Sequence, residues 1–176
     1  MEPDRDEMLE FGAAIKAAME SDDPEVELTA PNGARHRIVK HPAPGVSARL
    51  EIEHANAPAM TSILWEPADE RPEGFPDGIP FVPHTPCATA TIDSARKVWN
   101  QVQWSAVENG DAVAEQIVRA SLADGWEHAR VQPNVPPSRR VVALEWGTSR
   151  RIVTLSAEGD TATVTLSDTG PHAPGS

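Results

Sequence analysis

The chain has 176 residues, of which 39% are hydrophobic, so it is long enough to bury a core and is not a disordered chain. Its formal net charge is −12 at pH 7, and residues 1–70 carry 15 acidic and 6 basic residues whereas residues 71–176 carry 12 and 9. This negative field repels nucleic-acid phosphates and anionic lipid. We therefore expect no nucleic-acid binding, and either a basic protein partner or a purely solubilising acidic surface.

The sequence also limits where the protein resides. It contains no apolar run of the length that a membrane-spanning helix needs. The segment MEPDRDEMLE at the N-terminus is acidic, where a secretory signal peptide is basic and then apolar. The single cysteine, Cys87, cannot form an intrachain disulfide. We expect a cytoplasmic protein with no membrane span, or a mature form whose leader was removed.

Residues 1–66 are predicted to form a first unit of order α-β-β-β-β. Apolar residues at helical spacing predict an amphipathic helix from about Asp4 to Glu20. The segments Glu25–Ala30 and Arg35–Lys40 flank a Pro-Asn-Gly-Ala turn, which is typical of a hairpin. Strict alternation over 46–53 predicts a half-buried strand, and Met60–Trp65 completes a four-stranded meander.

Residues 67–86 are predicted to be a proline-rich, acidic connector. The segment from 66 to 86 contains six prolines, which exclude a helix or a central strand. It also carries four large apolar residues, which a solvated linker rarely does. We therefore expect the connector to be pinned to a surface through Phe75, Ile79, Phe81 and Val82.

The second unit, residues 87–167, begins with two predicted strands, Ala88–Ile92 and Lys97–Val107, followed by a helix between Asn109 and Trp126. Asp111 is predicted to cap this helix, and its apolar stripe follows the 3.6-residue period. Gly125 stands where a left-handed terminating residue is needed, so Trp126 can fold back into the core. The stripe consists of Val113, Ile117, Ala120 and Leu122.

After the helix come a short segment, Glu127–Val131, a proline loop, and strands at Arg139–Trp146, Arg150–Leu155 and Thr161–Leu166. The last strand should present Ala162, Val164 and Leu166 to the interior. The second unit thus has the order β-β-α-β-β-β, and residues 168–176 are predicted to be a flexible tail. The fold class is α+β, with two small, mostly antiparallel units that each pack a helix on one sheet face.

Residues 75–166 resemble an uncharacterised bacterial α+β domain that is often found in lipoproteins. A proline-rich lead-in, here Pro76 and Pro80, precedes a helix that ends in Leu-x(2,3)-Gly-Trp, here Leu122, Gly125 and Trp126. Strands around Leu144 and Val153 continue the resemblance. The chain departs from the family in having Ile117-Val118 where an aromatic pair is common, and in lacking a lipid-attachment cysteine. The motif is structural, so the resemblance implies a fold rather than an activity.

Few residues have a side chain and a spacing that could support metal binding or catalysis. His84 and Cys87 have a spacing that supplies at most two of the four ligands of a structural zinc site, so we predict no metal site. No activating group adjoins Cys87, which predicts a partly buried, inert thiol. Glu51 and Glu53 are predicted to lie on the solvent-exposed face of a strand, where a catalytic carboxylate pair is not expected.

Two further groups of residues are assigned to the surface. Arg139-Arg140 and Arg150-Arg151 begin neighbouring strands and are predicted to form a small basic patch. Four other histidines are expected to be solvated, as is usual at strand ends and in loops. They are His36, His41, His54 and His128.

These patterns favour a non-enzymatic protein with no cofactor, which binds a protein partner or itself through an exposed sheet face or edge. The alternative is a small-molecule-binding protein or small enzyme, with a tryptophan-lined pocket between the two units. The candidate interaction or pocket residues, common to both hypotheses, are aromatic. They are Trp65, Trp99, Trp104, Trp146, Phe75 and Phe81.

Overall fold

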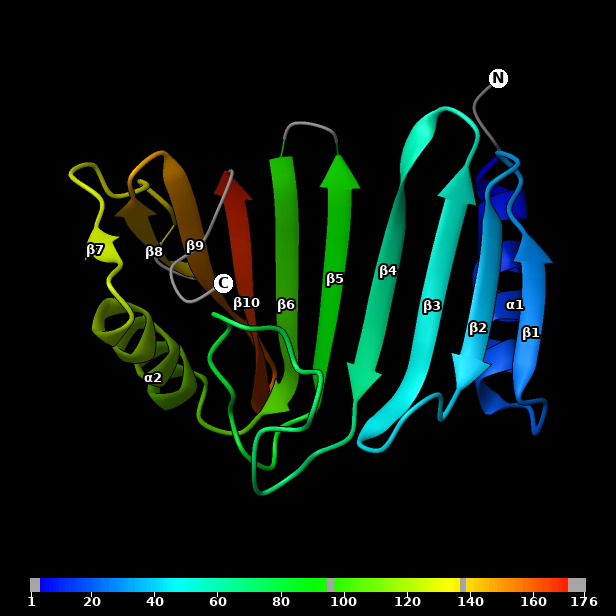
Figure 1. Ribbon diagram of the computed structural model, residues 1–176, viewed down its shortest axis with the longest axis horizontal. Helices are drawn as coiled ribbons and strands as arrows, with labels where there is room; N and C mark the ends of the chain where they lie inside the picture. Colours follow the sequence, from blue (N-terminus) through cyan, green and yellow to red (C-terminus); the bar gives the residue numbers. More distant parts are fainter. Residues whose placement is uncertain (1–3, 95–96, 137–138, 171–176) are drawn as a thin grey trace.

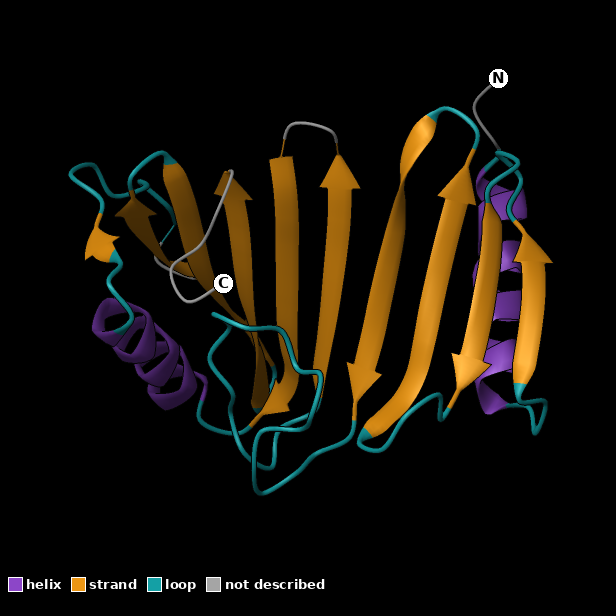
Figure 2. Ribbon diagram, viewed as in Figure 1, coloured by secondary structure: helices purple, strands orange, loops and turns teal. Residues whose placement is uncertain are grey.

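The computed structural model describes residues 4–94, 97–136 and 139–170, and for residues 93, 94, 97–100 and 158 it describes the backbone alone. These residues form two helices and ten strands (Figures 1 and 2). In chain order the elements are α1 (Arg5–Glu20), β1 (Glu25–Thr29), β2 (Arg35–Lys40), β3 (Val46–His54), β4 (Ala57–Trp65), β5 (Cys87–Ser94), β6 (Lys97–Val107), α2 (Gly110–Ala123), β7 (Glu127–His128), β8 (Arg139–Trp146), β9 (Ser149–Glu158) and β10 (Thr161–Gly170).

All ten strands lie in one antiparallel sheet, in the order β1-β2-β3-β4-β5-β6-β10-β9-β8-β7. The α+β class and the antiparallel sheet are confirmed, but the strands of the two predicted units are not separate. The pairing of β4 with β5 runs from Met60 opposite Ile92 to Trp65 opposite Cys87 and joins them. The connector leaves β4 and enters β5 at the same end of the sheet, so these two strands pair as a hairpin with a long loop.

The two helices lie on opposite faces of this sheet. On one face Phe11 of α1 packs edge-on against His36 of β2, with ring centroids 4.9 Å apart. On the other face α2 covers β9 and β10, and apolar residues of the connector pack in one core with residues of β6. Figure 1 shows the connector in front of the sheet and α1 behind it. The strand register agrees with this arrangement. Ala90 of β5 lies on the face that α1 covers, whereas the larger Val102 and Trp104 of β6 lie on the face that α2 covers.

The main core lies under α2 and the connector. The prediction that apolar residues pin the connector is confirmed, since Phe75, Ile79 and Val82 are buried in this core and Phe81 packs against it. The inward alternation of β10 is also confirmed. The buried members of the core are Val46, Trp65, Phe75, Ile79, Val82, Cys87, Val102, Trp104, Val107, Ile117, Val153, Val164 and Leu166.

The ends of α2 agree with the sequence pattern in one respect and differ in another. The cap is Asn109, whose side chain accepts from the Ala112 amide at 3.1 Å, and not Asp111, which lies inside the first turn. A capping residue must have non-helical backbone angles, and Asn109 has them (φ −117°, ψ 81°). At the other end Gly125 has φ +106° and Trp126 is buried, so both of those predictions are confirmed.

Two helical glycines should respond oppositely to alanine. A Cβ on Gly110 would lie 2.5 Å from Leu155 Cδ1 and 2.7 Å from Ala162 Cβ, whereas one on Gly12 would meet nothing within 4 Å. Gly110→Ala should therefore lower the free energy of unfolding by about 1–3 kcal/mol through overpacking. Gly12→Ala should raise it by about 0.5–1 kcal/mol, because alanine is the better helix former. Denaturant titrations of both variants test this pair, and equal signs would contradict it.

Candidate functional site

The structure gathers most of the aromatic candidates in the core rather than around an opening. Trp65 and Phe75 have ring centroids 5.2 Å apart, and Phe75 and Phe81 are 5.6 Å apart. The Trp65 indole donates to Thr89 Oγ1 at 3.0 Å, and Trp104 is fully buried in the same core. Trp146 lies apart from them, at the end of β8, and is 41% exposed. The side chain of Trp99, in β6, lies outside the described residues.

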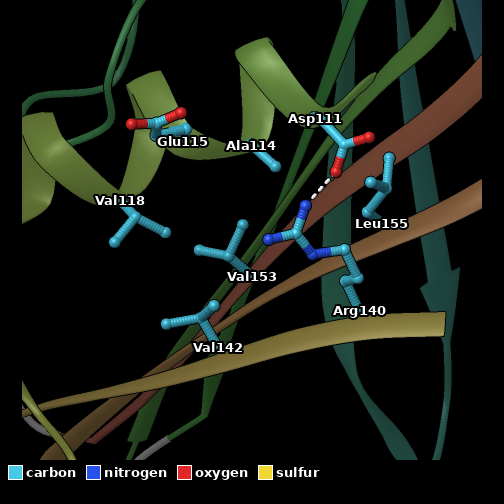
Figure 3. A pocket seen from close by; sticks show the side chains of 8 residues that line it. All are labelled: Asp111, Ala114, Glu115, Val118, Arg140, Val142, Val153 and Leu155. Atoms are coloured by element: carbon cyan, nitrogen blue, oxygen red, sulfur yellow. Dashed lines mark hydrogen bonds and ion pairs between the residues drawn. The ribbon is translucent and has the colours of Figure 1, made fainter. Parts of the chain in front are cut away.

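A cleft opens between α2 and the sheet, over β8 and β9 (Figure 3). Its floor is apolar, and Arg140 forms an ion pair with Asp111 at its rim. The volume is about 190 Å³, which is smaller than the roughly 300–1,000 Å³ of ordinary ligand pockets. It suits one apolar side chain better than a cofactor. The lining consists of Asp111, Ala114, Glu115, Val118, Arg140, Val142, Val153 and Leu155.

Deeper under α2 lies a buried ion pair that the sequence analysis missed. Arg151 Nε and Nη2 donate to the two carboxylate oxygens of Asp168 at 2.7 and 2.8 Å. Two further N–H groups of Arg151 donate to Ser121 Oγ at 2.8 Å and to the Gly78 carbonyl at 3.0 Å, and its guanidinium carbon lies 4.4 Å from the centre of the Trp126 ring. The Arg151 cluster, defined by these five residues, joins β9, β10, α2 and the connector. Because so many of its polar atoms are already bonded, it serves as a structural clamp.

The predicted basic patch is therefore wrong. Arg151 is buried, and Arg140 is on the opposite face from Arg139 and bonds to Asp111. The signal that could have revealed this was the two-residue period of β9 and β10. It places Arg151 on the same face as Val153, and Asp168 on the same face as Leu166.

The H-x-x-C pair is divided between two environments. His84 is exposed and lies 2.9 Å from Asp69, whereas Cys87 is buried in the core. Within the described residues no group of three or more histidine, cysteine or acidic side chains could hold a metal ion. The structure thus places these two side chains in no common site.

The thiol of Cys87 should be inert in the folded protein. Burial raises its pKa to about 12, so the thiolate is scarce at pH 8. A disulfide reagent at pH 8 should modify Cys87 far more slowly in buffer than in denaturant. Equal rates in the two conditions would contradict the buried placement.

The histidines differ in their surroundings. His36 is not solvated as expected but half-buried against α1, and this burial lowers its pKa. His41 is exposed beside Glu66, and His54 Nε2 lies 3.1 Å from the Asn32 carbonyl. His128 is exposed. These imidazoles come from different elements and form no shared site in the described part of the chain.

One edge of the sheet, at β8, is covered over most of its length. Strand β7 pairs with the end of β8, and next to it the Ala129 amide donates to the Ala143 carbonyl at 3.0 Å. The side-chain carboxamide of Gln132 then takes the place of a strand partner. Its Oε1 accepts from Ala143 N at 2.9 Å and its Nε2 donates to Ala143 O at 3.0 Å. The Arg139 amide donates to the Pro136 carbonyl. Backbone groups that would template another strand on β8 are thus largely occupied.

The opposite edge, β1, is open. Lys40 N donates to the Pro24 carbonyl at 2.9 Å, and Ala30 N donates to the Ala34 carbonyl at 2.8 Å. In an antiparallel ladder such bonds involve alternate residues, so the backbone groups of Glu25, Glu27 and Thr29 face away from β2. Figure 1 shows no described strand beyond β1, and α1 lies behind it. All three residues are exposed.

The sheet face opposite α1 is charged over β1 to β3. Arg37 Nε lies 2.5 Å from Glu25 Oε1, and its Nη1 lies 3.2 Å from Glu51 Oε2. The hydrogen bond between Arg37 and Glu25 lowers the pKa of Glu25 and raises that of Arg37. Arg35 pairs with Glu53 at 2.7 Å. The outward placement of the Glu51 and Glu53 carboxylates, expected from the alternation, is observed as a ladder of surface ion pairs.

The chain matches no family model, no curated protein and no solved structure. Within the described residues, no helix is both long and apolar enough to cross a membrane.

Proposed function

We propose that this protein is a non-enzymatic interaction module that binds an extended segment of a partner protein along the β1 edge. The observation that carries the proposal is the contrast between the two ends of the sheet. The Gln132 side chain and β7 occupy most of the outward backbone groups of β8, whereas those of β1 face solvent in the described part of the chain. An extended peptide that adds to such an edge gains main-chain hydrogen bonds.

The alternative, a small-molecule pocket lined by tryptophans between two units, has weaker support. Trp65 and Trp104 are buried in one core that extends from β3 to β9, and the strands of both units are continuous in one sheet. The cleft under α2 is small and is lined by none of the aromatic candidates. Strand addition at β1, by contrast, does not require any of the aromatic candidates to be exposed.

The test uses the outward amide of residue 27. Glu27→Pro removes this N–H, while the ladder bonds to β2 come from the alternate residues and survive. Glu27→Ala is the matched control, because it removes the carboxylate as Glu27→Pro does but keeps the N–H. Peptides selected from a random display library on the intact protein should bind Glu27→Pro at least roughly tenfold more weakly than Glu27→Ala, since two or more main-chain bonds depend on this edge.

A second readout locates the bound peptide. The amide protons of Glu25, Glu27 and Thr29 should become protected from hydrogen exchange on binding, because strand addition gives them acceptors. Selected peptides that bind Glu27→Pro as tightly as the intact protein, with unchanged exchange in β1, would overturn the proposal.

A further inference from the structure

We infer that the segment added to β1 is basic, with lysine or arginine at alternate positions and apolar residues between them. The inference rests on the proposed strand addition and specifies the chemistry of the partner. It follows from what β1 presents on each face of the sheet, from the charge around the edge, and from the disfavoured pairing of two copies.

On the face opposite α1, β1 presents Glu25 and Glu27, both exposed. Side chains directly across from each other on antiparallel strands lie about 4.5–5.5 Å apart at Cβ, close enough for an ion pair. Arg37 lies directly across from Glu27 on the β2 side, but its guanidinium bonds to Glu25 and Glu51. A cation on an added strand would therefore find Glu27 next to it.

The segment that forms the edge carries charge of one sign, although Arg35 and Arg37 lie on the neighbouring strand β2. Residues 20–29 contain five acidic residues and no basic one, and all five are exposed. Such a field attracts a cationic segment during encounter and repels an anionic one. The five are Glu20, Asp22, Asp23, Glu25 and Glu27.

On the other face β1 is apolar. Val26 and Leu28 are half-buried and lie opposite Ile38 and His36, which are on the face that α1 covers. Side chains on an added strand alternate between the two faces, so every second residue would lie beside this apolar surface. An apolar residue there would bury area against Val26 and Leu28, whereas a charged one would lose hydration.

A second copy of the chain is a poor occupant. Two β1 strands paired antiparallel about Glu27 would place Glu27 opposite Glu27, and like charges directly across a sheet are destabilising. The β8 edge of another copy is also unsuitable, because Gln132 and β7 cover it. The edge therefore favours a basic strand from a different protein.

The test uses peptides of about six residues, a typical strand length, and the full chain. One peptide alternates lysine with valine, a second replaces each lysine by glutamate, and a third has the composition of the first with the lysines grouped together. The alternating lysine peptide should bind at least roughly tenfold more tightly than the glutamate peptide, protect the amides of Glu25, Glu27 and Thr29, and weaken as salt is raised.

Charge-neutralising variants localise the effect. Glu25→Gln with Glu27→Gln should weaken the lysine peptide roughly 2- to 30-fold, the range expected for two cross-strand ion pairs. Glu115→Gln with Glu145→Gln changes the net charge equally, on α2 and β8 at the other end of the sheet, and should leave the affinity within about twofold. Equal losses in the two double variants would overturn the inference.

The remaining outcomes separate this inference from the proposed function. Library peptides that protect β1 but show no preference for alternating basic residues would overturn the inference and leave strand addition standing. If neither library nor lysine peptides protect β1, both proposals are wrong. A dimer of the chain alone that dissociates on Glu27→Pro would make the second copy the occupant and overturn the basic-partner inference.

Discussion

Asp168→Asn should lower the free energy of unfolding by about 3–5 kcal/mol, the usual effect of removing one partner from a buried ion pair. The substitution preserves the volume of the side chain but leaves the Arg151 guanidinium, which is 0% exposed, without a counter-charge. The bonds of Arg151 to Ser121 and to the Gly78 carbonyl do not neutralise it. Urea titrations monitored by tryptophan fluorescence measure the effect.

Two controls separate the buried charge from other consequences. Arg35→Met breaks the Arg35–Glu53 pair, whose side chains are 75% and 61% exposed, and should cost less than about 1 kcal/mol. The double variant Arg151→Met with Asp168→Leu removes both charges and should be more stable than Asp168→Asn alone. If Asp168→Asn and Arg35→Met have equal costs, the Arg151 cluster is not the clamp that its geometry indicates.

Most of the secondary structure could be predicted from the sequence, because each element has its own local sequence pattern. The bounds of β6 and β8 match the predicted Lys97–Val107 and Arg139–Trp146, since runs of β-branched and aromatic residues end at turns there. Gly125 ends α2 through a positive φ that only glycine adopts easily. These features depend on a few neighbouring residues and on no distant contact.

The single sheet could not be predicted in the same way. It depends on the pairing of β4 with β5 across the connector, and nothing local in Met60–Trp65 or Cys87–Ser94 specifies that partner. The proline-rich composition of residues 67–86 suggested a division between units, whereas its apolar residues in fact bury themselves on the shared sheet. The position of α1 on the opposite face from α2 follows from this pairing.

The candidate site could be predicted only in part from the sequence. The acidic charge of residues 20–29 is plain in the sequence, but the open state of β1 depends on β2 being its only described neighbour. The sealing of β8 requires Gln132 to reach Ala143, eleven residues away, and no sequence period signals that contact. The buried Arg151 had a signal in strand alternation, yet arginine is so rarely buried that the pattern favoured a surface interpretation.

Trp126→Ala should also cost about 3–5 kcal/mol, because the indole is 2% exposed and its removal leaves a large cavity. The ring has a second role, since the Arg151 guanidinium lies over it at 4.4 Å. A desolvated cation–π contact contributes roughly 2 kcal/mol. Trp126→Phe retains an aromatic face and should lose less, whereas Trp146→Ala, at the exposed end of β8, should change stability by less than about 1 kcal/mol.

The decisive measurement is the coupling free energy between Trp126 and Arg151. If the ring and the guanidinium act as one unit, Trp126→Ala combined with Arg151→Met should cost less than the sum of the single losses, by about 0.5–3 kcal/mol. Strict additivity in urea titrations would mean that Trp126 contributes only hydrophobic volume. Substantial coupling would mean that Trp126, at the end of α2, and the Asp168 carboxylate of β10 hold the same cation, so that one cluster anchors both the helix and the connector to the sheet.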